Sequence, residues 1–257
     1  MGKYVYGALS DVGDVRLENQ DSILCLSENA ADQQAALFLI ADGMGGLSYG
    51  AYASQLIAAR FRCWWQEDFS AMLMAGRDSE EDIKELMEQE LWDINQEILH
   101  FRHNKQCRCG STISLLLLYK GKYYIENMGD SRIYLLRKGR LTQLTKDQSL
   151  AAQMVREGRL TEEEARSSEH KNVLTMCLGM FDIPYSFFLS GALKRTDLFL
   201  LCSDGLYNAL TAEKMEFILN QKRVPLEMRV GELRNAIPYG NGRDNISVIA
   251  VSSEIEA

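Results

Sequence analysis

The sequence of 257 residues predicts an α+β fold in which strands pair as hairpins and two long helices are inserted together. Short turns at Lys120-Gly121 and Lys138-Gly139 separate neighbouring apolar runs, which is typical of β-hairpins. Helical patterns at 49–65 and 79–101 follow one another without an intervening strand, which indicates α+β layering rather than βαβ alternation. Because the chain shows neither an internal repeat nor a linker, we expect one domain over residues 1–257.

Apolar runs and helical periodicity define the elements of the first half of the chain. Strands are expected at residues 4–9, 22–26 and 35–41. Asp42 ends the third run, and a glycine-rich segment, Gly43-Met44-Gly45-Gly46, precedes the first helix. The second helix begins at Ser79, because Ser79-Glu80-Glu81-Asp82 has the form of a capping box, and its apolar side chains recur at helical spacing.

The second half of the chain consists mainly of short strands. We expect strands at residues 112–119, 122–128, 132–137, 173–177, 185–189, 198–202 and 246–252. Helices are expected at residues 149–157, 161–166, 212–219 and 226–235, the second of them capped by Thr161 and Glu164.

Charge and residue counts exclude several classes of function. A net charge of −8 argues against nucleic acid or an anionic membrane as the main partner, since both need clustered Lys and Arg. No apolar run approaches the roughly 20 residues of a bilayer span, and the first residues lack the apolar core of a signal peptide. We therefore expect a cytoplasmic protein.

The counts of His and Cys leave carboxylates as the groups that carry the chemistry. Three His exclude a multi-His zinc site and disfavour a Ser-His-Asp triad. Of the six Cys, only Cys107 and Cys109 are suggestively spaced, and all six are expected to be reduced thiols.

Four Asp residues lie at strand ends or beside glycine: Asp42, Asp130, Asp204 and Asp244. Any one of them is explained as a turn former or a helix N-cap. Four in the same setting indicate a cluster of hard oxygen ligands suited to Mg²⁺ or Mn²⁺. The glycine-rich segment after Asp42 also allows a phosphate cradle, but it lacks the spacing and the Lys of a nucleotide-binding loop.

Six short segments together resemble the metal-dependent protein serine/threonine phosphatases, the protein phosphatase 2C family, in their bacterial form. They are Gly13-Asp14-Val15-Arg16-Leu17-Glu18-Asn19-Gln20-Asp21, Ala41-Asp42-Gly43-Met44-Gly45-Gly46, Gly110-Ser111-Thr112, Met128-Gly129-Asp130-Ser131-Arg132 through Leu144-Thr145-Lys146-Asp147, Ser203-Asp204-Gly205-Leu206 and Gly242-Arg243-Asp244-Asn245-Ile246-Ser247. Each segment alone is weakly specific, whereas six in order over residues 13–247 are highly specific.

The resemblance implies a central β-sandwich of two antiparallel sheets between helical layers, a four-layer αββα arrangement, with a flap at about residues 148–175. It implies two ions of Mn²⁺ or Mg²⁺, with a weaker third ion in bacterial members. The implied metal ligands are Asp21, Asp42, the carbonyl of Gly43, Asp130, Asp204 and Asp244. In that assignment Asp42 bridges two ions, Asp21 acts largely through water, and Asp130 helps to hold the third.

The implied activity is the hydrolysis of phosphoserine and phosphothreonine on proteins by a metal-activated water, in opposition to a Ser/Thr kinase. Arg16 is expected to bind the substrate phosphate, because its planar fork matches two phosphate oxygens. Arg16, Asp42 and Asp204 are thus the expected catalytic residues, and we expect a monomer. Two other interpretations stay open: a pseudophosphatase that binds phosphoproteins without turnover, and a phosphatase of small metabolites.

The sequence departs from the family pattern at four positions. Gln20 replaces the usual Glu before Asp21, which predicts weaker binding of the second ion. Met44 replaces the His of eukaryotic relatives, so protonation of the leaving group is expected to come from solvent or metal-bound water. Gln148 and Met176 replace the common His and Arg at the edges of the flap, where they are expected to affect the choice of substrate. His170, within the flap, is a weaker candidate for contact with substrate.

Overall fold

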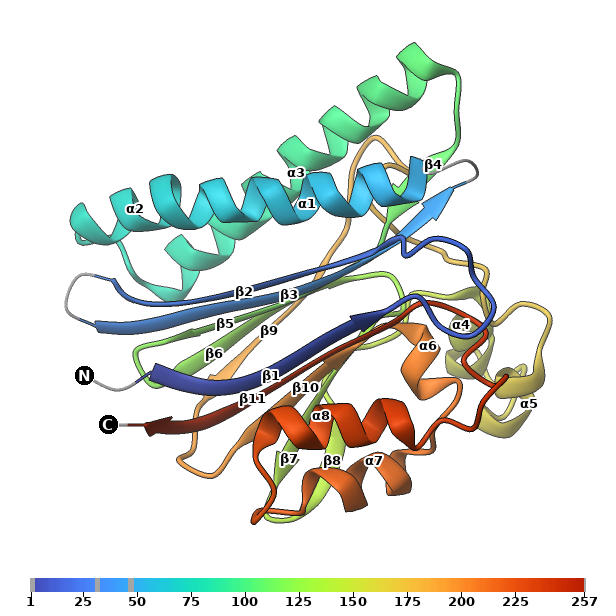
Figure 1. Ribbon diagram of the computed structural model, residues 1–257. Coiled ribbons are helices and arrows are strands. Elements are labelled where there is room, and N and C mark those ends of the chain that lie inside the picture. Colours follow the sequence, from blue (N-terminus) through green and yellow to red (C-terminus); the bar gives the residue numbers. More distant parts are fainter. Residues whose placement is uncertain (1–2, 31–32, 46–48, 257) are drawn as a thin grey trace.

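The structure is a computed structural model and describes residues 3–30, 33–45 and 49–256. Two antiparallel sheets face each other (Figure 1). The first sheet has the order β1-β11-β10-β7-β8, formed by Lys3–Asp11, Ile246–Glu256, Leu198–Cys202, Arg132–Arg137 and Arg140–Gln143. The second has the order β2-β3-β5-β6-β9, formed by Asp21–Ala30, Gln33–Gly45, Ile113–Tyr119, Lys122–Met128 and Phe187–Ala192. A short strand, β4 (Cys109–Ser111), also pairs with β3.

Helices cover the outer face of each sheet, so the predicted four-layer αββα arrangement is confirmed (Figure 1). The second sheet is covered by α1 (Tyr49–Trp64), η1 (Trp65–Phe69), α2 (Ser70–Met74) and α3 (Glu80–Lys105). The first sheet is covered by α7 (Ala212–Leu219) and α8 (Leu226–Asn235). Three apolar clusters fill the spaces between the layers, one under each helical layer and one between the sheets.

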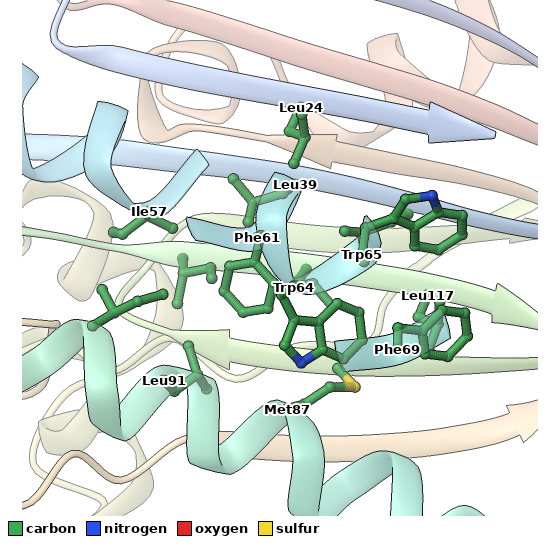
Figure 2. Close-up of a cluster of buried hydrophobic side chains, with 14 of the residues drawn as sticks. Leu24, Leu39, Ile57, Phe61, Trp64, Trp65, Phe69, Met87, Leu91 and Leu117 are labelled. Carbon is green, nitrogen blue, oxygen red and sulfur yellow. The ribbon is translucent and has the colours of Figure 1, made fainter. Parts of the chain in front are cut away.

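The largest apolar cluster fixes the long helices on the second sheet. Trp64 and Phe69 stack with their ring centroids 5.2 Å apart, and Met87 of α3 lies beside Trp64 (Figure 2). The expected capping box at Ser79 and Asp82 starts α3. The helical chain after Trp64 continues through the π-helical turn η1, which buries Trp65 and Phe69 on the cluster.

Several predicted elements differ from the structure. Residues 173–177 form no strand; Leu174 makes a single bridge to Ser149. The strand expected at 185–189 is β9, which begins at Phe187. Strand β8 and the one-turn helix α6 (Asp204–Tyr207) had no sequence signal, because each is only four residues long.

The segment 148–175, here called the flap, carries two short helices, α4 (Leu150–Arg156) and α5 (Glu162–Ser167). Its two ends meet, because the Leu150 amide donates to the Val173 carbonyl at 2.7 Å and the Thr175 amide donates to the Gln148 carbonyl at 2.7 Å. The flap therefore leaves and rejoins the sandwich at neighbouring points, next to the end where β10 passes into α6 (Figure 1).

No helix among the described residues is both long enough and apolar enough to cross a bilayer.

Candidate metal centre

The five predicted Asp ligands come from both sheets. Asp21, the first residue of β2, pairs in register with Asp42 of β3. Asp130 follows β6 in the same sheet. From the other sheet, Asp204 follows β10 and begins α6, and Asp244 precedes β11, the neighbour of β10. The strand order thus brings carboxylates far apart in the sequence to one end of the sandwich.

A cavity of about 670 Å³ collects most of the predicted site. Its lining includes Arg16, Asp42, Gly43, Asp130, Asp204 and Asp244. Asp21 is not part of this lining and is buried, with one carboxylate oxygen accepting a hydrogen bond from the Ser203 hydroxyl at 2.8 Å. The structure therefore places the predicted residues together, with Asp21 behind the cavity wall.

Burial and mutual repulsion raise the pKa values of the central carboxyl groups. Burial and then the charges of Asp21 and Asp204 raise the pKa of Asp42 well above its ordinary value. Burial and then the charges of Asp130 and Asp244 raise the pKa of Asp204 to about 8, although Arg16 opposes that rise. Each of these carboxyl groups disfavours ionisation of its neighbours, as expected for acids that share one site.

The two buried outer carboxyl groups show the same effect to a smaller degree. Burial is the main cause that raises the pKa of Asp21 to about 6, while hydrogen bonds from Ser203 and Ser247 oppose it. Burial and the charge of Asp147 raise the pKa of Asp130 to about 6. A divalent cation at this place would reverse the balance, because it stabilises the ionised form of every carboxylate near it.

The donor set fits a hard divalent ion. All side-chain donors are carboxylates, the ligands that Mg²⁺ and Mn²⁺ prefer. The second oxygen of Asp21, Oδ1, is buried and accepts no hydrogen bond from the described residues. Within those residues, no three Asp, Glu, His or Cys side chains are grouped tightly enough to hold an ion as they stand. Asp244 is engaged elsewhere, so an ion competes with Arg16 for its carboxylate.

Arg16 lies at the rim of the cavity on the loop between β1 and β2. Its Nε and Nη2 donate to the two carboxylate oxygens of Asp244 at 2.9 and 2.7 Å. The Arg16 side chain remains 57% exposed to solvent. Arg16 is therefore both a partner of a predicted ligand and an accessible cation.

The segment Gly110-Ser111-Thr112 holds the backbone of Asp42. Thr112 exchanges two hydrogen bonds with it, its amide donating to the Asp42 carbonyl at 2.9 Å and its hydroxyl accepting from the Asp42 amide at 3.0 Å. The Ser111 hydroxyl also donates to the Asp42 carbonyl. These contacts give the third family segment a physical role that the sequence alone did not show.

Asn245 is a site residue that sequence reasoning did not single out. Its side-chain amide donates to the carbonyls of Val12 and Glu18, and its side-chain oxygen accepts from the Gln20 amide at 2.9 Å. It thereby fixes the loop that presents Arg16. Its only sequence signal was its position next to Asp244 in the last family segment.

Glycines after two of the Asp residues allow close approach of other chain segments. A Cβ atom on Gly43 would lie 2.2 Å from the Gly50 carbonyl oxygen at the start of α1. A Cβ atom on Gly205 would lie 2.0 Å from the Asn245 carbonyl oxygen. A side chain larger than hydrogen at either position would therefore force these backbone segments apart.

Three of the four departures from the family pattern lie in or beside the site. Gln20 and Met44 line the cavity. Gln148 anchors the flap, accepting from the Gly129 amide at 2.8 Å and donating to the Tyr185 carbonyl. Met176 packs against the large apolar cluster. His170 is partly buried beside Glu169 and does not line the cavity.

Comparisons with known proteins agree with this fold and identify the family. The profile of the family described as Protein phosphatase 2C matches residues 14–227. Serine/threonine phosphatase stp of Listeria welshimeri is 32% identical over 256 residues, which cover 96% of this chain and 94% of the relative. The solved S. agalactiae serine/threonine phosphatase has a TM-score of 0.87 and 29% identity, with 97% and 99% of the two chains covered. The catalytic domain of the serine/threonine protein phosphatase PstP, in complex with two manganese ions, has a TM-score of 0.81 and 27% identity, with 98% and 99% covered. The chain belongs to the protein phosphatase 2C family.

Proposed function

We propose that this chain hydrolyses phosphoserine and phosphothreonine on proteins and requires Mn²⁺ or Mg²⁺ for it. The observation that carries the proposal is the cavity in which carboxylates from both sheets meet beside the exposed Arg16. Two comparisons support it: relatives named serine/threonine phosphatases, and the structurally similar PstP with two manganese ions.

In this proposal the ions are held by Asp21, Asp42, the Gly43 carbonyl, Asp204 and Asp244, with Asp130 in a weaker third site. The mutual rise in pKa among the carboxyl groups supports a common site for cations. When bound, such ions supply Lewis acidity that makes a water molecule nucleophilic at neutral pH. We propose that all these residues act within one domain covering residues 1–257.

The residues of the chain bind and orient the phosphoryl group. Arg16 exchanges the carboxylate of Asp244 for two phosphate oxygens, which its planar fork matches equally well. Among the described residues neither Cys nor His lines the cavity, so there is no thiol or imidazole to accept the phosphoryl group, and water attacks the phosphorus directly. Met44 carries no proton to give, and the leaving serine or threonine oxygen therefore takes its proton from solvent.

The proposed setting is signalling in the cytoplasm, where the protein acts as a monomer on proteins phosphorylated by a Ser/Thr kinase. The net charge of −8 supports a protein substrate over nucleic acid or an anionic membrane.

Hydrolysis of p-nitrophenyl phosphate with Mn²⁺, with EDTA, and by the Asp204→Asn variant tests the proposal. We expect activity that needs Mn²⁺ and is lost in the variant, while thermal melting shows that the variant is folded. Absence of activity at millimolar Mn²⁺ in a folded wild-type protein would refute it. Phosphopeptides compared with small phosphoesters under the same conditions then separate a protein phosphatase from a phosphatase of metabolites.

A pseudophosphatase is the second candidate, and Gln20 is the observation that favours it. Gln20 lines the metal cavity, where its amide nitrogen lies 3.3 Å from a Glu18 carboxylate oxygen and contributes no charge toward an ion. Binding of a phosphopeptide without turnover, restored to turnover by Gln20→Glu, is the result that this candidate predicts.

A further inference from the structure

A second cavity, of about 460 Å³, lies between the flap and the sandwich. Its lining contains five Lys or Arg side chains and two acidic ones, in a chain whose net charge is −8. We call it the basic pocket and define it by Arg132, Lys146, Arg156, Arg166 and Lys171. Such a local excess of positive charge attracts anions against the field of the whole protein.

The acidic side chains of the pocket do not neutralise this charge. Asp147 is paired with Arg132, whose guanidinium donates to both carboxylate oxygens of Asp147. The same guanidinium stacks on the Tyr207 ring, 3.6 Å from the ring centroid. Within the described part of the chain, Arg156 donates to the backbone carbonyl of Asp147, at 3.0 Å, and to no carboxylate. Among the described residues that line the pocket, Glu162 is the acidic side chain that remains, and Glu213 outside the lining is close enough to feel the charge of Arg166.

Three of these cations have no carboxylate partner in the part of the chain that the structure describes. Within residues 3–30, 33–45 and 49–256, Lys146, Arg166 and Lys171 form no ion pair. The Lys146 ammonium lies 5.7 Å from the centroid of the Phe187 ring, and Arg166 acts on Glu213 only through its charge. All three side chains are exposed and therefore accessible to a ligand.

The basic pocket adjoins the metal centre. Asn172 lines both cavities. Asn208, in the lining of the basic pocket, donates to the carboxylate of Asp204 at 3.1 Å. Tyr207, also in that lining, donates from its hydroxyl to the Asp130 carbonyl at 3.1 Å. A peptide with its phosphoryl group at the metal centre thus has the basic pocket as its neighbour along the flap.

We propose that the basic pocket binds a second anionic group of the substrate polypeptide while the first phosphoryl group occupies the metal centre. This inference rests on the proposed function. The chemistry fits a second phosphoryl group or a Glu or Asp side chain, and the phosphoryl group binds better because it carries a charge of about −1.5 to −2. The preferred substrate is accordingly a doubly phosphorylated segment, followed by an acidic one and then by a neutral one.

One phosphothreonine peptide in three forms tests the inference on the full chain with Mn²⁺. A second position carries Ala, Glu or phosphoserine and is moved stepwise along both sides of the phosphothreonine. At the best position, the anionic forms should show a lower KM with little change in kcat, and added salt should reduce the difference. The Glu and phosphoserine forms separate the two sources of negative charge.

Charge-neutralising variants connect the preference to the pocket. Lys171→Gln and Arg166→Gln should each lower the ratio of kcat/KM for the anionic form to that for the Ala form by about two- to fivefold, as expected for exposed ion pairs. Lys222→Gln removes the same charge from a loop outside the pocket and should leave the ratio unchanged. The inference would be overturned by a kcat/KM ratio near one at every position in the wild type. It would also be overturned if the variant with both Lys171→Gln and Arg166→Gln kept the wild-type preference for the anionic peptides.

Hydrolysis of p-nitrophenyl phosphate, which has no second anionic group, separates the two proposals. If the wild type hydrolyses it and shows no anionic preference, only the basic pocket inference fails. If the wild type does not hydrolyse it, the proposed function fails, and fluorescence anisotropy of the labelled doubly phosphorylated peptide decides about the pocket. Weaker binding by Lys171→Gln and Arg166→Gln than by Lys222→Gln supports the pocket, and equal binding refutes it.

Discussion

The buried carboxyl group of Glu126 in β6 should make the protein less stable as the pH rises. Its side chain is 0% exposed, and neither carboxylate oxygen finds a hydrogen-bond partner among the described residues. Burial raises the pKa of Glu126 to about 8, with Glu88 adding to the rise and Ser186 and Lys84 opposing it. Because the ordinary value is 4.5, the folded protein keeps this proton at pH values where the unfolded chain has lost it.

The sign and size of the effect follow from proton linkage. Below about pH 4.5 the Glu126 carboxyl group is protonated in both the folded and the unfolded state, so it does not lower the free energy of unfolding. Between there and about pH 8 only the unfolded state ionises, so the free energy of unfolding decreases as the pH rises. From 4.5 to about 8, at about 1.4 kcal/mol per pH unit, the full loss is about 5 kcal/mol, with about 3 kcal/mol reached by pH 7.

Urea unfolding of the wild type and Glu126→Gln, at a series of pH values between about 5 and 8.5, measures this loss. The Gln side chain cannot ionise, so the variant should lack this part of the decrease, whatever constant offset its buried amide adds. Glu85→Gln neutralises an exposed carboxylate of α3 that is not among the charges acting on Glu126, and it should follow the wild type. Parallel curves for the wild type and Glu126→Gln over the whole range would refute the reasoning.

Three further outcomes are expected. Mn²⁺ should raise the melting temperature, and EDTA should reverse this rise. An ion that binds only the folded state stabilises that state by mass action, by about 2.7 kcal/mol at a hundredfold excess over Kd. Identical melting curves with and without Mn²⁺ would contradict a metal site. Gln20→Glu should shift this melting response to lower Mn²⁺ concentration, because it adds a negative charge to the cavity lining, and an unchanged titration would make Gln20 irrelevant to the ion. Arg132→Gln should lower the free energy of unfolding by about 3 kcal/mol in urea titration, because Asp147, whose side chain is only 14% exposed, loses its ion-pair partner. Arg159→Gln, which breaks an exposed pair, should change the free energy of unfolding by less than about 1 kcal/mol. Equal effects of these two Arg substitutions would contradict the assignment of Asp147 to Arg132.

Patterning in the sequence was sufficient for elements with a strong local signal. The Ser79 capping box and the apolar spacing after it predicted α3, which the structure confirms. Residues 173–177 have apolar side chains like a strand, but the backbone there closes the flap through single contacts and finds no partner strand. Strand β8 was missed because Arg140–Gln143 alternates exposed and partly buried side chains over only four residues and depends on β7 for pairing.

The sequence indicated that the Asp residues lie at strand ends. It did not indicate which other residues hold the loops around them in place. Asp21 and Asp42 meet because β2 and β3 are neighbours, and local sequence indicates only that each lies at the edge of a strand. The contacts of Asn245 with the loop at 12–20 join residues more than two hundred positions apart. Contacts of that kind depend on the sheet order, which a single sequence does not specify.

The closed base of the flap has a consequence for the history of this protein. Its ends are joined by the bonds from Leu150 to Val173 and from Thr175 to Gln148, so its interior can lengthen, shorten or be replaced while both sheets keep their strand order. Lys171 and Arg166 lie inside that interval, and the Asp residues of the cavity all lie outside it. Such an arrangement lets related enzymes keep the same cavity residues during evolution while the sequence of the flap diverges. A flap exchanged between relatives at residues 148 and 175 would carry the side chains of Arg156, Arg166 and Lys171 with it and leave Arg132 and Lys146 in place.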